Sequence, residues 1–188
     1  EKSFNRISVD GDTSTNDTIL ALANGTSGVL VQSESALLTF QQHLHQVCLE
    51  LAKTIVRDGE GATKLVQIIT RNAASESDAY KVCEAVAHSN LVKTALYGED
   101  PNWGRITAAA GRSGAYLDPD LLDLYFDDQP LVLNGCWLGP DAEKKAGAVM
   151  KNNEITLTLD LKLGQFSDFY WFCDFSEDYV KINADYRS

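Results

Sequence analysis

The residues with the clearest potential for chemistry are the acidic ones of a glycine-rich segment, residues 57–64, which reads RDGEGATK. Glu60 lies between two glycines, and glycine permits both a tight turn and a close approach of the backbone to a ligand. A carboxylate held in such a turn is suited to bind the ammonium group of a substrate. The alternative is a solvated acidic turn in which glycine only ends a helix, as is common in such sequences.

The elements on either side of this segment would position Glu60. Residues 65–69 (LVQII) form a short, partly β-branched apolar run that predicts a buried strand. Upstream, large apolar residues recur every three or four positions and predict one face of a long helix: Leu37, Phe40, Leu44, Val47, Leu51 and Ile55. Asp58 and Glu60 thus follow a helix C-terminus, where the macrodipole disfavours each carboxylate by ~0.3–1 kcal/mol. Their charge is unusual for that position.

A second polar segment, residues 10–17 (DGDTSTND), places three carboxylates and three hydroxyls in eight positions. These residue types favour turns and helix N-caps. The segment is either a polar loop that supports a binding site or a capped connection between two elements, and its spacing does not separate the two.

Composition excludes several classes of protein. The 188 residues are 44% hydrophobic and 23% charged, as in globular proteins, and carry a formal net charge of -11. The acidic charge argues against binding to nucleic acid or to an anionic membrane surface, since both depend on clustered Lys and Arg. No apolar run approaches the ~18–20 residues of a membrane span, and nothing resembles a signal peptide. The chain opens without Met, at Glu1, so we expect a fragment or a processed subunit.

The cysteines and histidines do not predict a metal site. Cys48, Cys83, Cys136 and Cys173 are far apart and form no C-x-x-C pair. We interpret them as small buried hydrophobes in a reducing compartment. The histidines lack the spacing of metal ligands. We interpret Trp103 as a core residue, with a site residue as the alternative.

The rest of the pattern predicts a layered α/β fold. Phe4 and Ile7 resemble the end of a helix, a short strand is expected at residues 28–31, and a helix at residues 76–96 with an interruption near Ser89. Later elements are expected as strands at 121–126, 131–133, 154–163 and 169–175 and a helix at 139–150. We place residues 1–97 in the main α/β sandwich domain and residues 98–188 in a smaller α+β domain.

Four segments together resemble one family from end to end. They are SFNRI (3–7) leading into DGDTSTND (10–17), RDGEGATK (57–64), GEDPNWGR (98–105), and YV (179–180) with INADYR (182–187). They are similar to the β chain of the ornithine acetyltransferase of arginine biosynthesis, the bifunctional ArgJ family, which in many organisms is also a glutamate N-acetyltransferase. The resemblance implies a layered sandwich of the self-cleaving, DmpA-like type and favours the substrate-binding interpretation of Glu60.

The resemblance also implies a mechanism. Such a precursor cuts itself and exposes a threonine, which takes acetyl from N-acetylornithine as an ester and passes it to glutamate. Glu1 is not that threonine, so we expect no catalytic residue in this chain, a nucleophile upstream, and oxyanion donors on the α chain. The expected partners are that α chain, in an αβ pair assembled as α2β2, and the substrates N-acetylornithine, ornithine and glutamate. No bound cofactor or metal is expected, acetyl-CoA is a possible co-substrate, and the location is cytoplasmic.

By the same resemblance, Glu60, Asn183 and Ser188 bind substrate. The family usually has threonine where this chain has Ser188, which keeps the hydroxyl and loses the methyl. Asp12, Thr13, Asn16 and Asp17 have a supporting role in the loop. The alternatives are a related self-cleaving amidase or aminopeptidase, in which water replaces glutamate, and a non-catalytic fragment that only folds and associates.

Overall fold

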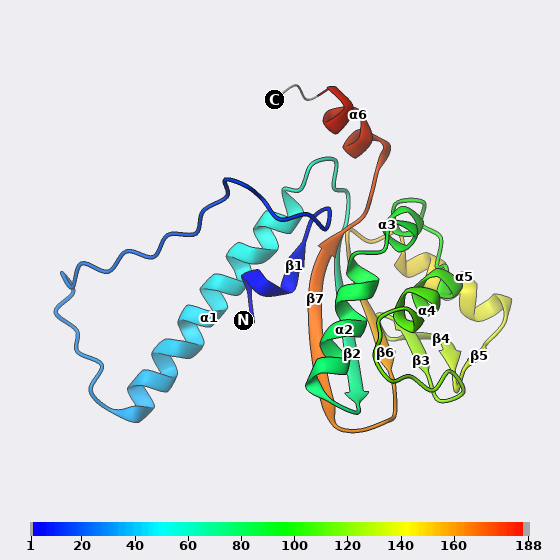
Figure 1. Cartoon of the computed structure of the whole chain (residues 1–188), viewed down its shortest axis with the longest axis horizontal. Coiled ribbons are helices and arrows are strands. Elements are labelled where there is room, and N and C mark those ends of the chain that lie inside the picture. Colours follow the sequence, from blue (N-terminus) through cyan, green and yellow to red (C-terminus); the bar gives the residue numbers. More distant parts are fainter. Residues whose placement is uncertain (1, 186–188) are drawn as a thin grey trace.

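The computed structural model describes residues 2–185, which form a seven-stranded mixed sheet covered by helices (Figure 1). In chain order the elements are the 3-10 helix η1 (Phe4–Arg6), β1 (Ile7–Ser8), α1 (Glu34–Arg57), β2 (Leu65–Ala73), α2 (Glu76–Ala87), α3 (Asn90–Tyr97), α4 (Trp103–Gly111), β3 (Asp123–Phe126), β4 (Gln129–Leu133), β5 (Cys136–Trp137), α5 (Pro140–Val149), β6 (Glu154–Asp160), β7 (Phe166–Cys173) and α6 (Glu177–Asp185). The predicted mixed α/β class is confirmed.

The strand order is β1-β7-β2-β6-β3-β4-β5. β2 is an interior strand, parallel to β6 and antiparallel to β7, and β1 runs parallel to β7 at the edge. The strands of the two predicted domains are therefore interleaved in a single sheet, with β2 between β6 and β7. The boundary after residue 97 stays a prediction.

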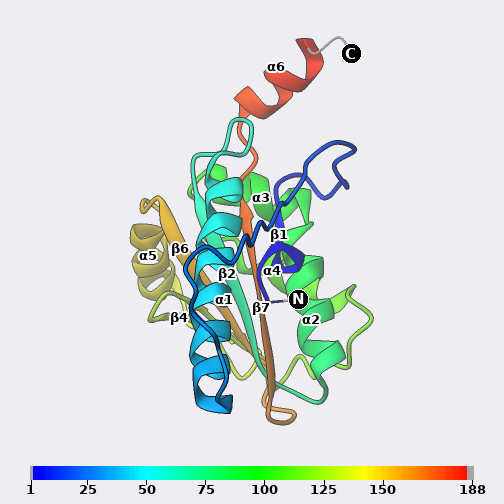
Figure 2. The same cartoon turned by 90° about the vertical axis from the view of Figure 1, so that its left-hand side faces the viewer.

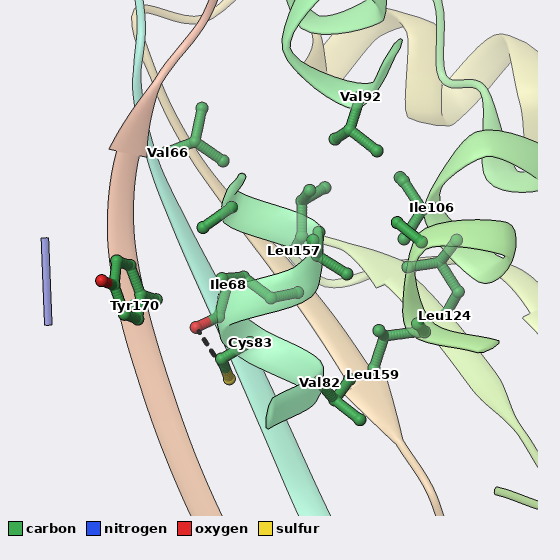
Figure 3. Packing of buried hydrophobic residues seen from close by; sticks show 14 of the residues in the cluster. Val66, Ile68, Val82, Cys83, Val92, Ile106, Leu124, Leu157, Leu159 and Tyr170 are labelled. Atoms are coloured by element: carbon green, nitrogen blue, oxygen red, sulfur yellow. Dashed lines mark hydrogen bonds between the residues drawn. The ribbon is translucent and has the colours of Figure 1, made fainter. Parts of the chain in front are cut away.

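The two faces of the sheet are covered by different helices (Figure 2). Because side chains alternate along a strand, Val66 and Ile68 of β2 enter the large core beneath α2, whereas Leu65 packs with Val56 of α1. Figure 3 shows the large core, in which Cys83 of α2 lies over β2 and donates to the carbonyl of Ile68. α1 and α2 thus lie on opposite faces, and the turn after α1 leads directly into β2.

Side-chain caps explain where four helices begin. Ser33, Ser75 and Ser89 precede α1, α2 and α3, and each accepts a hydrogen bond from the backbone N–H three residues ahead. Asn102 does the same for α4. Ser89 also confirms the predicted interruption, since α2 ends at Ala87 and α3 starts at Asn90.

The predicted long helix is confirmed as α1, but its apolar stripe does not face the sheet. The residues of the stripe are all exposed, from 43% for Ile55 to 56% for Leu37 and Val47. The sheet instead receives Ala52 and Val56, which are fully buried. Within the described residues, no other helix or strand covers the stripe. Only the C-terminal half of α1 therefore packs against the sheet.

Several local predictions were wrong. Residues 28–31 lie in an irregular segment, since no described strand pairs with them. Phe4 does lie in a helix, the 3-10 helix η1, but Ile7, which caps its end, is already the first residue of β1. Trp103 is 36% exposed at the start of α4 and is not a core residue. Cys136 is exposed in an edge strand, whereas Cys83 and Cys173 are buried as expected and Cys48 is intermediate; none of the four is in a disulfide.

A polar cluster lies at the end of the sheet that is far from the turn after α1. Buried Asp123 accepts hydrogen bonds from Lys162 Nζ at 2.6 Å, from the backbone N–H of Asn134 at 2.7 Å and from Tyr125 Oη at 3.1 Å. Burial opposes ionisation of Asp123, but these donors outweigh it and lower the pKa of the carboxyl. The ionised carboxylate is thus the form that the fold stabilises.

We therefore expect Asp123→Asn to destabilise the complete protein. The difference in free energy of unfolding between this variant and wild type should become smaller at acidic pH. A carboxyl whose pKa is lowered on folding contributes stability that is present above its unfolded pKa, about 3.9, and lost as the pH falls through the folded value. Urea unfolding of both proteins between neutral pH and about pH 3 measures this difference. A difference that is independent of pH would contradict this role.

Candidate functional site

The candidate site lies at the turn between α1 and β2, at the end of the sheet opposite the Asp123 cluster. Asp58 donates its backbone N–H to Thr54 and Gly59 donates to Val56, which ends α1. Gly61 then adopts a φ of +67°, in the region that favours glycine. A Cβ atom at Gly61 would lie 2.5 Å from the backbone nitrogen of Tyr179, so only glycine lets the turn pack against α6.

This turn brings together two of the predicted site residues. Asn183 Nδ2 donates to Glu60 Oε2 at 2.8 Å, and also to the backbone carbonyl of Tyr179 at 3.0 Å. Both Glu60 and Asn183 are exposed, so a ligand can reach the pair from solvent. The pair combines a carboxylate, which accepts hydrogen bonds, with an amide that donates and accepts. Because both amide hydrogens of Asn183 are engaged within the chain, the groups of the pair that remain free are acceptors, which suit the ammonium group of a ligand.

The first turn of α6 and the residues before it fix Asn183 relative to Glu60. Ser176 Oγ donates to the carbonyl of Gly61 at 2.6 Å, and Phe175 stacks on Tyr179 with ring centroids 4.4 Å apart. Buried Asp174 accepts three hydrogen bonds from the far side of the same turn, from the N–H and Oγ1 of Thr63 at 2.8 and 2.5 Å and from the N–H of Lys64 at 2.9 Å. The turn and the segment that leads into α6 are therefore bound as one unit.

The loop at residues 10–17 approaches this unit through Asp10. Asp10 Oδ2 accepts a hydrogen bond from Tyr179 Oη at 3.3 Å. Burial, followed by this carboxylate, raises the pKa of Tyr179. The hydroxyl therefore stays protonated and can donate at neutral pH.

The other predicted site residues are not at the Glu60–Asn183 contact. Asp12, Thr13, Asn16 and Asp17 are exposed, and the hydrogen bonds found for three of them join residues of the same loop. Their supporting role stays a prediction. Ser188 lies outside the described residues. Among residues 2–185, no group of three or more His, Cys, Asp or Glu side chains is placed to hold a metal ion, and no helix is long and apolar enough to cross a membrane.

Sequence reasoning missed the residues that hold the site together. Asp174 follows an aromatic strand and carries no local signal. Tyr179 belongs to one of the family-like segments, but the sequence did not predict its partner. Their partners are about 110 and 169 positions away, respectively, in the sequence. Asp10 was within the polar loop, but the pattern did not separate it from its neighbours.

Comparison with known proteins identifies the family. The model of the ArgJ family matches residues 1–188. The chain belongs to the ArgJ family. It is 50% identical to the "Glutamate N-acetyltransferase" of Methanocaldococcus jannaschii and 50% identical to the "Arginine biosynthesis bifunctional protein ArgJ" of Geobacter sulfurreducens. Each alignment covers 100% of this chain and 48% of the relative, so the chain spans about half the length of these curated relatives.

A solved ArgJ structure supports the same assignment. The crystal structure of the arginine biosynthesis bifunctional protein argJ from Bacillus halodurans superposes with a TM-score of 0.91 at 36% sequence identity. The match covers 98% of this chain and 88% of that chain. The sheet and helices described above are therefore an ArgJ fold, and the predicted resemblance is confirmed.

Proposed function

We propose that this chain is part of an acetyltransferase of arginine biosynthesis that moves acetyl from N-acetylornithine to glutamate through an acetyl-threonine intermediate. The observation that carries the proposal is the exposed contact between Glu60 and Asn183, 2.8 Å long, in a chain of the ArgJ family. The Glu60 carboxylate pairs with the side-chain ammonium of N-acetylornithine. The Asn183 amide nitrogen already donates to Glu60 and to Tyr179, so its side-chain oxygen accepts from the same ammonium.

The nucleophile belongs to the part of the protein upstream of this chain. Its threonine hydroxyl attacks the acetyl carbonyl, ornithine leaves with the proton, and the amine of glutamate then takes the acetyl group from the ester. Donors on the α chain stabilise the oxyanion of each tetrahedral intermediate. Ser188 completes the substrate pocket, and Asp12, Thr13, Asn16 and Asp17 support it. Acetyl-CoA serves as an additional acetyl donor if the enzyme is bifunctional, and we expect the enzyme in the cytoplasm.

We further propose that the α chain covers the exposed apolar surface of this chain, and that the pair assembles as α2β2. Two observations support the α chain as the partner. The curated relatives are about twice as long as this chain. The exposed apolar residues are also too numerous and too contiguous for a free surface. They are Ile19, Leu20, Leu22, Val29, Leu30 and Val31 before α1, and Leu37, Leu38, Phe40, Leu44, Val47, Leu51 and Ile55 on it.

The test compares the complete protein with the isolated chain. With N-acetylornithine and glutamate, we expect the complete protein to form ornithine and N-acetylglutamate in equal amounts, and the isolated chain to form neither. Release of acetate in place of N-acetylglutamate would favour the amidase alternative. Absence of any turnover by the complete, processed protein would overturn the proposal.

A further inference from the structure

The structure contains a buried cation that the proposed function does not use. Lys93 of α3 is 1% exposed, and its ammonium donates to the backbone carbonyls of Val9, at 2.6 Å, and of Cys173. The ammonium also lies 4.5 Å from the ring centroid of Phe175. Carbonyl oxygens and an aromatic face thus replace the water that the charge has lost. Burial lowers the pKa of Lys93, while the neighbouring Cys173, Asp174 and Asp10 act in the opposite direction.

The two carbonyls bound by Lys93 belong to the two segments that reach α6. Val9 directly precedes Asp10, which binds the hydroxyl of Tyr179. Cys173 is the last residue of β7 and leads through Asp174 into α6. The main chain of Lys93 adds a third tie, since its carbonyl accepts the N–H of Phe175 at 3.1 Å. One residue therefore joins the start of the polar loop to the base of α6.

A continuous series of contacts connects Phe175 to the Glu60–Asn183 pair. Phe175 stacks on Tyr179, the carbonyl of Tyr179 accepts a hydrogen bond from Asn183, and Asn183 donates to Glu60. Val9 also lies directly against the turn between α1 and β2 that carries Glu60, because a Cβ atom at Gly59 would lie 2.9 Å from Val9 Cγ1. α6 has no fully buried residue of its own, so its position depends on these few contacts at its first turn.

We propose that Lys93 is a positioning residue for the amino-acid substrate: it holds Val9, which follows β1, and Cys173, the last residue of β7, together beneath α6, and thereby sets the distance between Asn183 and Glu60. The proposal rests on the proposed function, because Glu60 and Asn183 bind substrate only if that function is right. Lys93 itself does not touch substrate.

The test replaces Lys93 by methionine in the complete enzyme. Methionine keeps an unbranched side chain that is one atom shorter and leaves the carbonyls of Val9 and Cys173 without their donor. We expect KM for N-acetylornithine to rise by about tenfold or more with a smaller change in kcat, because a displaced binding pair weakens ground-state and transition-state binding alike. We also expect faster hydrogen–deuterium exchange in residues 177–185. Phe175→Leu, at a partly exposed position, serves as a second variant and is expected to raise KM in the same direction.

Lys162→Met is the matched control, since Lys162 also binds a buried partner but lies at the far end of the sheet, with Asp123. A residue that only stabilises the fold would lower the active fraction and leave KM unchanged, and this is the result expected for Lys162→Met. The proposal is overturned if Lys93→Met and Phe175→Leu both keep the wild-type KM in an active enzyme, or if exchange in α6 does not change. If the wild-type enzyme transfers no acetyl group, the proposed function fails, and the exchange measurement still decides whether Lys93 holds α6.

Discussion

Glu60→Ala in the complete enzyme is expected to lower kcat/KM for N-acetylornithine by roughly 10- to 100-fold, the range that corresponds to one hydrogen bond to a charged group. The variant removes the carboxylate that we propose pairs with the substrate ammonium, and it leaves Asn183 Nδ2 without the acceptor at 2.8 Å. Self-cleavage should proceed as in wild type, because the proposed nucleophile and its base lie upstream of this chain. Steady-state kinetics of the processed variant measure the effect.

Asp58→Ala provides the control for Glu60→Ala. Asp58 is an exposed carboxylate on the same turn, two residues away, and it caps α1 through its backbone N–H instead of its side chain. Its replacement removes the same charge from the same region. An equal loss of kcat/KM in both variants would therefore reflect only the negative charge of the turn, and not a contact made by Glu60. Kinetic constants for Glu60→Ala that equal those of wild type would remove Glu60 from the site.

The turn that carries Glu60 could be predicted because its signals are local. Apolar periodicity before residue 57 predicts a helix, and the β-branched run after residue 64 predicts a strand. The glycines between them predict a tight turn. The structure places both elements as expected, as α1 and β2. Asn183 had no such signal. Its contact with Glu60 spans 123 residues, and only the resemblance to a family with a known site suggested it.

The errors share one physical origin, which is that burial depends on partners that periodicity does not identify. The stripe on α1 has the spacing of a core face, yet in the described residues it faces away from the sheet. Residues 28–31 have strand composition, but a strand also needs a neighbour for its backbone hydrogen bonds. Lys93 shows the reverse case. A lysine in a short helix is expected in solvent, and its burial requires carbonyls from Val9 and Cys173, both more than 75 residues away.

Gly61→Ala is expected to have the largest combined effect on stability and activity of the changes near the site. The methyl group would meet the backbone nitrogen of Tyr179 at 2.5 Å and Ser176 Oγ at 2.7 Å, so α6 must move away from the turn. The positive φ costs about 1–2 kcal/mol for a residue with a Cβ atom, and the overlap adds about 1–3 kcal/mol. Displacement of α6 separates Asn183 from Glu60, and we expect kcat/KM to fall by about tenfold or more.

Gly25→Ala separates the cost of the positive φ from the cost of the steric overlap. Gly25 has nearly the same φ, +70°, but a Cβ atom there meets nothing within 4 Å. Its replacement should therefore show at most the conformational cost and leave KM unchanged. Urea unfolding and steady-state kinetics of both variants give the comparison. If Gly61→Ala costs no more than Gly25→Ala and retains the wild-type KM, then the close packing of α6 on the turn at residues 58–64 does not determine substrate binding.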